Sequence, residues 1–256
     1  MKKVILGSAA ILALVVIGSQ NASAATLNAN GTVTTNGTIS FTTPTTTTPV
    51  TPVNPTNPTT PIDPTNPTAP IVITPDPGTG MSGPLSLDAV TNFDFGTDVV
   101  QAQAKTYYAK GVSATQGTVT TNIPNYVQVT DVRGTLVGWN VTAAVTKEFT
   151  GSSTGSTLNG AVMTLSKAQI TTSATTGNGA DKALGGNTSV ALGAAAQNIF
   201  GASAGKGAAT NDLLFGTATS NNTDTASGVS LYVPGGAAQA DSYSADITWT
   251  LSNTPA

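Results

Sequence analysis

Proline recurs at every third position through one stretch of this 256-residue chain, and no other feature restricts the backbone as much. Each proline ring fixes φ and removes an N–H donor, which excludes a helix interior and a central strand. Polyproline II also has three residues per turn, so the spacing favours an extended helix with its rings along one edge. The series is Pro49, Pro52, Pro55, Pro58, Pro61, Pro64, Pro67 and Pro70.

Residues 42–80 surround this series and contain 11 Pro and 14 Thr among 39 positions. We interpret them as a Pro/Thr-rich extended linker. At ~3.1 Å per residue, Pro44 to Pro77 would span on the order of 100 Å.

The first 24 residues have the pattern of a signal peptide. Lys2 and Lys3 precede an apolar run over residues 4–17, and Ala22-Ser23-Ala24 is a small-residue cleavage site. The run is shorter than the ~18 residues that a spanning helix needs. We therefore expect a secreted protein with no membrane span after cleavage. Residues 25–41 form a short mature N-terminal segment, in which residues 38–41 are compatible with a strand after the turn at Asn36-Gly37.

Charge and composition exclude several functions. Histidine and cysteine are absent, which rules out a disulfide framework, imidazole or thiolate metal ligands, and catalysis by either side chain. The net charge of −3 argues against a nucleic-acid partner. Cleavage leaves seven basic and twelve acidic residues, which disfavours an anionic membrane surface. No sorting signal or apolar tail follows Leu251, so retention at the cell surface would be non-covalent.

Residues 81–256 are long enough for one globular domain, and strand patterns dominate them. Apolar and polar residues alternate strictly over 243–251, with Trp249 and Leu251 on the apolar side, and again over 139–145 and 126–131. The valine side of 126–131 is expected to face the core. Further strands are predicted near residues 85–90, 112–120, 161–165, 189–192 and 229–233.

Helix signals are weak by comparison. Residues 101–110 and 194–200 are compatible with helices of two or three turns, and the glycines that follow the second argue against anything longer. The pattern predicts an all-β fold: an antiparallel β-sandwich C-terminal domain preceded by the extended linker.

The acidic residues are spread singly and form no obvious acid–base pair. Asp88, Asp94 and Asp98 are close in sequence, and we interpret them as turn and cap residues. No calcium-loop spacing and no Ser-x-x-Lys occurs. We expect a protein that is not an enzyme and has no catalytic residues, metal site or cofactor.

Binding is the more plausible activity. Trp139 and Trp249 are the only tryptophans, and each lies within a predicted strand. They can be core anchors between sheets, or stacking platforms for sugar rings with Asn, Gln and Thr as hydrogen-bond partners. The sequence leaves both alternatives open.

Three stretches resemble the motifs of WxL-domain surface proteins of low-GC Gram-positive bacteria. The terminal strand 243–255 is similar to the family's last motif, residues 126–141 resemble its upstream motif, and residues 84–96 match its usual opening. Val141 stands where leucine is usual, although it keeps the position apolar. The order of the segments, a signal peptide, a short N-terminus and a Pro/Thr-rich segment before the domain, also resembles that of the family.

The resemblance implies a WxL-like cell-wall-binding β domain over residues 81–256, with peptidoglycan or another cell-wall polymer as ligand. Its candidate ligand-binding residues are Trp139, Val141, Trp249 and Leu251. Such proteins associate with the wall non-covalently and can form complexes with surface proteins encoded nearby. The alternative is an adhesin or a subunit of a surface complex whose main ligand is another protein. An edge strand or residues 38–41 would then add to a partner sheet.

Overall fold

The computed structural model describes residues 26–27, 33–34, 39–44 and 48–256. The chain divides into two units, Met1–Phe41 and Thr42–Ala256. In the first unit, β1 (Thr26–Leu27) and β2 (Val33–Thr34) pair antiparallel. The predicted signal peptide lies outside the described residues, as do Asn36-Gly37 and Thr38. Residues 39–41 are described and form no strand.

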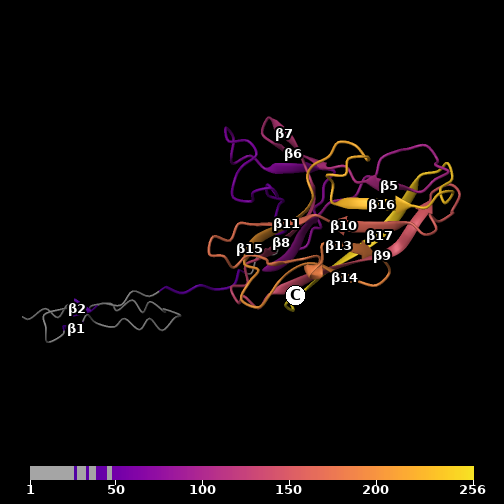
Figure 1. Ribbon diagram of the computed structural model, residues 1–256. Helices are drawn as coiled ribbons and strands as arrows, with labels where there is room; N and C mark the ends of the chain where they lie inside the picture. Colours follow the sequence, from indigo (N-terminus) through magenta and orange to yellow (C-terminus); the bar gives the residue numbers. More distant parts are fainter. Residues whose placement is uncertain (1–25, 28–32, 35–38, 45–47) are drawn as a thin grey trace, which may run out of the picture. The chain divides into compact units, whose positions relative to one another are not determined.

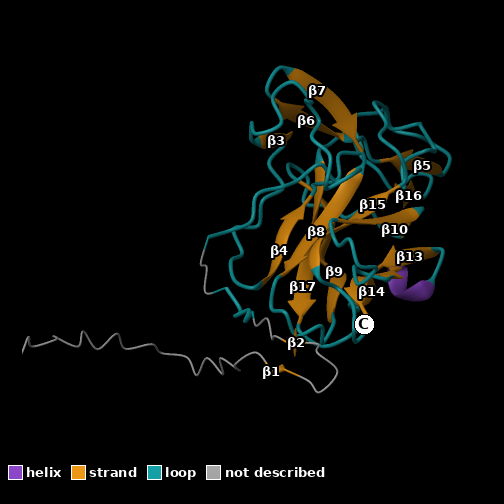
Figure 2. Ribbon diagram, turned by 90° about the vertical axis from the view of Figure 1, so that its left-hand side faces the viewer, coloured by secondary structure: helices purple, strands orange, loops and turns teal. Residues whose placement is uncertain are grey.

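The second unit consists of four antiparallel sheets (Figures 1 and 2). We name each sheet by a central strand. The β8 sheet has the order β11 (Ala168–Thr172), β15 (Ala209–Phe215), β8 (Asn125–Asp131), β4 (Leu85–Val90). The β9 sheet has the order β12 (Lys182–Ala183), β14 (Gln197–Ala202), β9 (Trp139–Gly151), β17 (Tyr243–Ser252).

The β10 sheet has the order β13 (Ser189–Leu192), β10 (Val162–Ser166), β16 (Val229–Val233), β5 (Lys105–Tyr108). The three-stranded β6 sheet has the order β3 (Ile71–Thr74), β6 (Val112–Gln116), β7 (Val119–Ile123). Four sheets in a propeller-like arrangement replace the two-sheet sandwich that the sequence predicts. The all-β class and the antiparallel pairing are confirmed.

Most predicted strands are present. The terminal strand is β17, the Trp139 strand is β9, and residues 126–131 lie in β8. The stretch 112–120 is interrupted at Gly117, whose positive φ allows the turn between β6 and β7. The only helical element among the described residues is the short 3₁₀ turn η1 (Leu184–Gly186). None of these residues forms a helix long and apolar enough to cross a membrane.

Neither predicted helix forms. Residues 101–110 contain β5, and residues 194–200 run into β14. Both stretches carry aromatic or β-branched side chains, such as Tyr107 and Ile199, that suit a half-buried sheet. Pairing of β5 with β16 and of β14 with β9 outweighs a weak helix preference.

The extended linker is also wrong over residues 48–80. Residues 54–69 form consecutive β-turns in which the N–H of one turn's last residue bonds the carbonyl of its first: Asn57 to Asn54, Thr60 to Asn57, Asn66 to Asp63 and Ala69 to Asn66. Proline occupies the second position of each turn, where its fixed φ is favourable. Chained four-residue turns that share their end residues repeat every three residues, so they share the period of polyproline II.

In three of these turns, the side chain of the first residue also closes an Asx-turn. Asn54 Oδ1 accepts hydrogen bonds from Thr56 N at 3.2 Å and Thr56 Oγ1 at 2.7 Å. Asn57 and Asp63 accept the same pair of bonds from Thr59 and Thr65. The Asx-Pro-Thr triplets therefore specify compact turns, because the local side-chain bonds compete with an extended backbone.

We call residues 51–69 the strap. Two buried glutamines hold it against the sheets. Gln116 Oε1 accepts from Ile62 N at 2.7 Å and Asp63 N at 2.9 Å, and its Nε2 donates to the carbonyls of Pro67 and Ala69. Gln128 Oε1 accepts from Val53 N at 2.9 Å. Together with β3, the strap is thus part of the second unit, which begins at Thr42 rather than at residue 81.

Two clusters of buried side chains form the core, and β8 lies between them. The valine side of β8, Val127 and Val129, joins the larger cluster, as the sequence predicts. The opposite side is buried too, because Tyr126 joins a smaller cluster with β6-sheet residues. The strap covers Gln128 on that side, so β8 is buried on both faces although its sequence alternates.

Candidate functional site

The structure brings the two tryptophan motifs together on neighbouring strands. β17 pairs antiparallel with β9, so that Leu251 lies opposite Val141 and Trp249 opposite Ala143. Two motifs about 110 positions apart in the sequence thus form one ladder. Val141 is fully buried, whereas Trp249 and Leu251 are half-buried against the larger core cluster.

Trp139 is a core residue with 0% of its surface exposed. Its indole Nε1 donates to the carbonyl of Gly207 at 3.0 Å, and its ring packs edge-to-face on Phe200 with centroids 4.9 Å apart. A Cβ at Gly207 would come within 2.4 Å of that Nε1, so the close approach requires glycine. Of the two roles left open for Trp139, the structure supports the core anchor.

The only arginine of the chain fixes the loop that leads into Trp139. Arg133 Nε and Nη2 bond the two Asp131 carboxylate oxygens at 3.0 and 2.7 Å. Nη2 also donates to the carbonyl of Gly138 at 2.8 Å. This paired geometry is the strong form of an arginine–carboxylate contact. The upstream motif therefore positions the tryptophan and leaves no free arginine for a ligand.

Trp249 lines a solvent-open groove of about 670 Å³. One wall runs from Val90, the last residue of β4, to Val100, and the other is β17 with the preceding turn. Residues of β9, β10 and β16 close the floor. Along β17 the groove side consists of Tyr243, Ala245, Ile247 and Trp249, which is the apolar side identified from the sequence.

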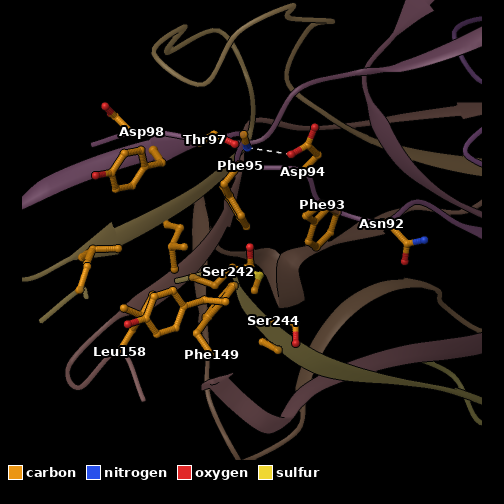
Figure 3. Close-up of a pocket in the computed structure, with 18 of the residues that line it drawn as sticks. Asn92, Phe93, Asp94, Phe95, Thr97, Asp98, Phe149, Leu158, Ser242 and Ser244 are labelled. Atoms are coloured by element: carbon orange, nitrogen blue, oxygen red, sulfur yellow. Dashed lines mark hydrogen bonds between the residues drawn. The ribbon is translucent and has the colours of Figure 1, made fainter. Parts of the chain in front are cut away.

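Aromatic rings are concentrated in this groove. Phe95 of the first wall and Phe149 of β9 meet edge-to-face with centroids 6.1 Å apart (Figure 3). Phe93, Tyr107 and Tyr243 also line it, all half-buried. The Tyr243 hydroxyl accepts from Gln239 N at 2.9 Å, which fixes the ring. These half-buried rings leave aromatic surface in the groove that a ligand can contact.

Polar side chains complete the groove. Asn92, Thr97, Gln239, Ser242 and Ser244 supply amides and hydroxyls. Three carboxylates also line it: Asp94, Asp98 and Asp241. None of the lining residues is lysine or arginine. The groove therefore combines aromatic faces, neutral hydrogen-bonding groups and negative charge.

Each of these carboxylates has partners that stabilise its ionised form. Asp94 accepts from Gly96 N at 2.7 Å, and this bond with the nearby Lys110 lowers the pKa of Asp94 (Figure 3). Lys105 pairs with Asp98 and lowers its pKa. Asp241 accepts from the backbone and hydroxyl of Thr154 and from neighbouring N–H groups, which hold its pKa well below the usual range.

The turn-and-cap interpretation holds for two of the three early aspartates. Asp94 closes a turn at Gly96, and Asp98 accepts from Val99 N at 2.8 Å. Asp88 differs, because it is buried under the strap and accepts from Ser86, Gln128 and Thr130. Asp88 and Asp94 are only six positions apart in the sequence, which does not indicate that one is buried and the other lines the groove.

The groove offers no carboxylic acid prepared for proton transfer, since all three lining carboxylates have lowered pKa values. The described residues also contain no group of three or more acidic side chains that could hold a metal ion.

Sequence reasoning missed some groove residues for identifiable reasons. Phe93, Phe95 and Tyr243 lie in the stretches that carry the resemblance, but nothing there indicates a shared groove. Phe149 enters from the far end of β9, and only the long-range pairing of β9 with β17 brings it there.

Comparison with known proteins gives one match. The family model described as WxL domain surface cell wall-binding matches residues 28–255. Neither the curated proteins nor the solved structures contain a match.

Proposed function

Because the chain belongs to the WxL-domain family of surface cell wall-binding proteins, we propose that it holds to peptidoglycan non-covalently through the β17 groove. The observation that carries this proposal is the position of Trp249. The terminal motif places this ring, half-buried, in a groove with five further aromatic side chains. In this account the protein is secreted through its signal peptide and retained at the wall of a Gram-positive cell.

The chemistry of the groove selects among wall polymers. Sugar rings stack on aromatic faces, and their hydroxyl and N-acetyl groups bond amides, hydroxyls and carboxylates. Asp94 and Asp98 are paired with Lys110 and Lys105, whereas Asp241 has no lysine or arginine partner among the described residues, so the groove keeps a net negative charge that disfavours a polymer with phosphate in every repeat. The glycan strand of peptidoglycan has no phosphate in its repeat and therefore fits better than a teichoic acid.

The four motif residues have different parts in this proposal. Trp249 is the contact residue, and Leu251 packs beside it on the same face of β17. Val141 and Trp139 support that strand from the core. The proposed role is non-catalytic, since it requires no reacting group, only a rigid groove.

The test is co-sedimentation of the mature chain, residues 25–256, with peptidoglycan stripped of protein and teichoic acid. We expect Thr97→Arg, which places a bulky side chain at an exposed position on the groove wall across from β17, to abolish binding without affecting the core. Thr248→Arg is the matched control, because Thr248 is an exposed threonine on the face of β17 opposite Trp249, outside the groove. Equal binding by both variants would show that the groove is not the site.

A second candidate function is supported by the free edge of β17. This strand is the longest edge strand of the second unit, and in the part of the chain that the structure describes its backbone pairs only with β9. Its regular part, Ile247–Ser252, carries no charge, bulge or proline, the usual protections of an edge. An extended strand of another surface protein could add there. Failure of the folded chain to bind stripped peptidoglycan would favour this candidate.

A further inference from the structure

The strap crosses the outer face of the β8 sheet at one buried row of side chains. On β15, Asp212 lies opposite Thr171 of β11 and opposite Gln128 of β8. Directly opposite residues in an antiparallel pair have Cβ atoms about 5 Å apart. Asp212 is thus the middle member of a row of three.

The two neighbours of Asp212 both bind the strap. Thr171 Oγ1 donates to the carbonyl of Pro55 at 2.6 Å. Gln128 accepts from Val53 N at 2.9 Å and contacts the carbonyl of Thr51 at 3.4 Å. Strap residues 51–55 therefore cover the position of Asp212 from both sides, and 0% of its surface is exposed.

Asp212 has no hydrogen-bond partner for either carboxylate oxygen. Asp88, by contrast, accepts three bonds in the same buried layer. A buried ionised carboxylate without donors is strongly unfavourable, so such groups take up a proton instead. Burial, and secondarily the charge of Asp88, raise the pKa of Asp212 well above its ordinary value.

The groups that face Asp212 supply no compensating positive charge. Asp88 on β4 raises its pKa further, and Tyr126 on β8 has a free buried hydroxyl. β11 and strap residues 51–62 contain no charged side chain. Asp76 is also negative, and its charge raises the pKa of the nearby Tyr126. Two carboxylates without a third acidic ligand make a poor metal site, in agreement with the lack of metal-binding clusters among the described residues.

We propose that Asp212 is a proton-binding site that controls docking of the strap. The neutral acid allows residues 51–55 to close over the β8 sheet, and ionisation drives them away so that water reaches the carboxylate. Release of residues 51–55 exposes Gln128 and Thr171, while Gln116 still holds Ile62 and Asp63.

The experiment follows amide hydrogen exchange in the full mature chain by NMR between pH 4 and 8, corrected for intrinsic rates. The Val53 N–H bonds Gln128 when residues 51–55 are docked. We expect its protection to fall about tenfold per pH unit in the range where Asp212 is neutral in the docked form and ionised in the released form. The N–H of Ile62 bonds Gln116 instead and serves as an internal reference. Constant Val53 protection over this range would overturn the proposal.

Variants test whether protonation of Asp212 causes the pH dependence of Val53 protection. Asp212→Asn mimics the neutral acid, so Val53 protection should become independent of pH, whereas Asp246→Asn, at an exposed position, should leave the wild-type profile. Thr171→Val removes the bond to Pro55 and should lower protection at every pH without changing the slope. That variant keeps the test valid if Asp212→Asn does not fold.

Adding millimolar CaCl₂ at fixed pH distinguishes a cation site. No change in Val53 protection is expected for the wild-type chain. An increase that disappears in Asp212→Asn would identify a calcium site and refute the proton-binding proposal.

Discussion

Replacing Gln116 tests whether the proline-rich segment is a folded part of the protein. One amide side chain makes four hydrogen bonds to the strap, at 2.7, 2.9, 3.2 and 2.9 Å. Gln116→Met keeps the length and volume of the side chain but removes all four bonds. A net hydrogen bond contributes about 1 kcal/mol, and buried groups left unpaired cost more. Because a released strap can rehydrate, we expect a loss of about 2–4 kcal/mol.

Urea unfolding of the mature chain measures this loss, since the midpoint gives the stability change when the slope is constant. Gln169→Met is the matched control, because Gln169 is exposed on β11. Small-angle scattering of Gln116→Met should also show a larger radius of gyration. A variant as stable and as compact as the control would refute the argument that Gln116 holds the strap.

Three further predictions concern the core, a glycine and pH. Trp139→Ala should cost about 3–5 kcal/mol in thermal unfolding, because it leaves a cavity and an unpaired Gly207 carbonyl; a variant with an unchanged Tm contradicts the core role. Gly207→Ala should lower the Tm as well, since its φ of +94° is unfavourable for alanine and the new Cβ meets the Trp139 indole; wild-type stability would show that the backbone adapts. Asp212 has a higher pKa folded than unfolded, so its contribution is present below the unfolded pKa and is lost as pH rises toward the folded one. Asp212→Asn should therefore flatten the stability profile above pH 4, and a profile parallel to wild type would contradict this.

Local periodicity was sufficient to predict most strands. The alternation in β17 and β9 and the valine side of β8 are written directly into adjacent residues. Such patterns identify a strand and its buried side, but they do not say which strands pair. The two-sheet sandwich was therefore wrong, because four sheets can be built from the same alternating segments.

The strap shows a different limit. A period of three fits both polyproline II and chained β-turns, and proline suits each. The Asx residue before Pro55, Pro58 and Pro64 distinguishes them, since its side chain closes the turn. Docking also depends on Gln116 and Gln128, about 50 to 75 positions away, and no local pattern reveals that.

The candidate site was predicted only in part. The sequence identified Trp249 and its side of the strand, but it gave the same status to Trp139, which is buried. Both rings lie in alternating strands, and their difference arises from the loop at Gly207 and the open edge of the β9 sheet. Burial of this kind is a tertiary property.

Fluorescence of single-tryptophan variants tests the central claim most directly. Trp139→Phe leaves Trp249 as the only indole, and Trp249→Phe leaves only the buried Trp139. Titration with soluble glycan fragments of peptidoglycan should shift the Trp249 emission and protect it from iodide quenching, while the Trp139 emission should not change. Binding of the fragments to the chain without any change at Trp249 would contradict the account, since the ligand would then lie outside the β17 groove.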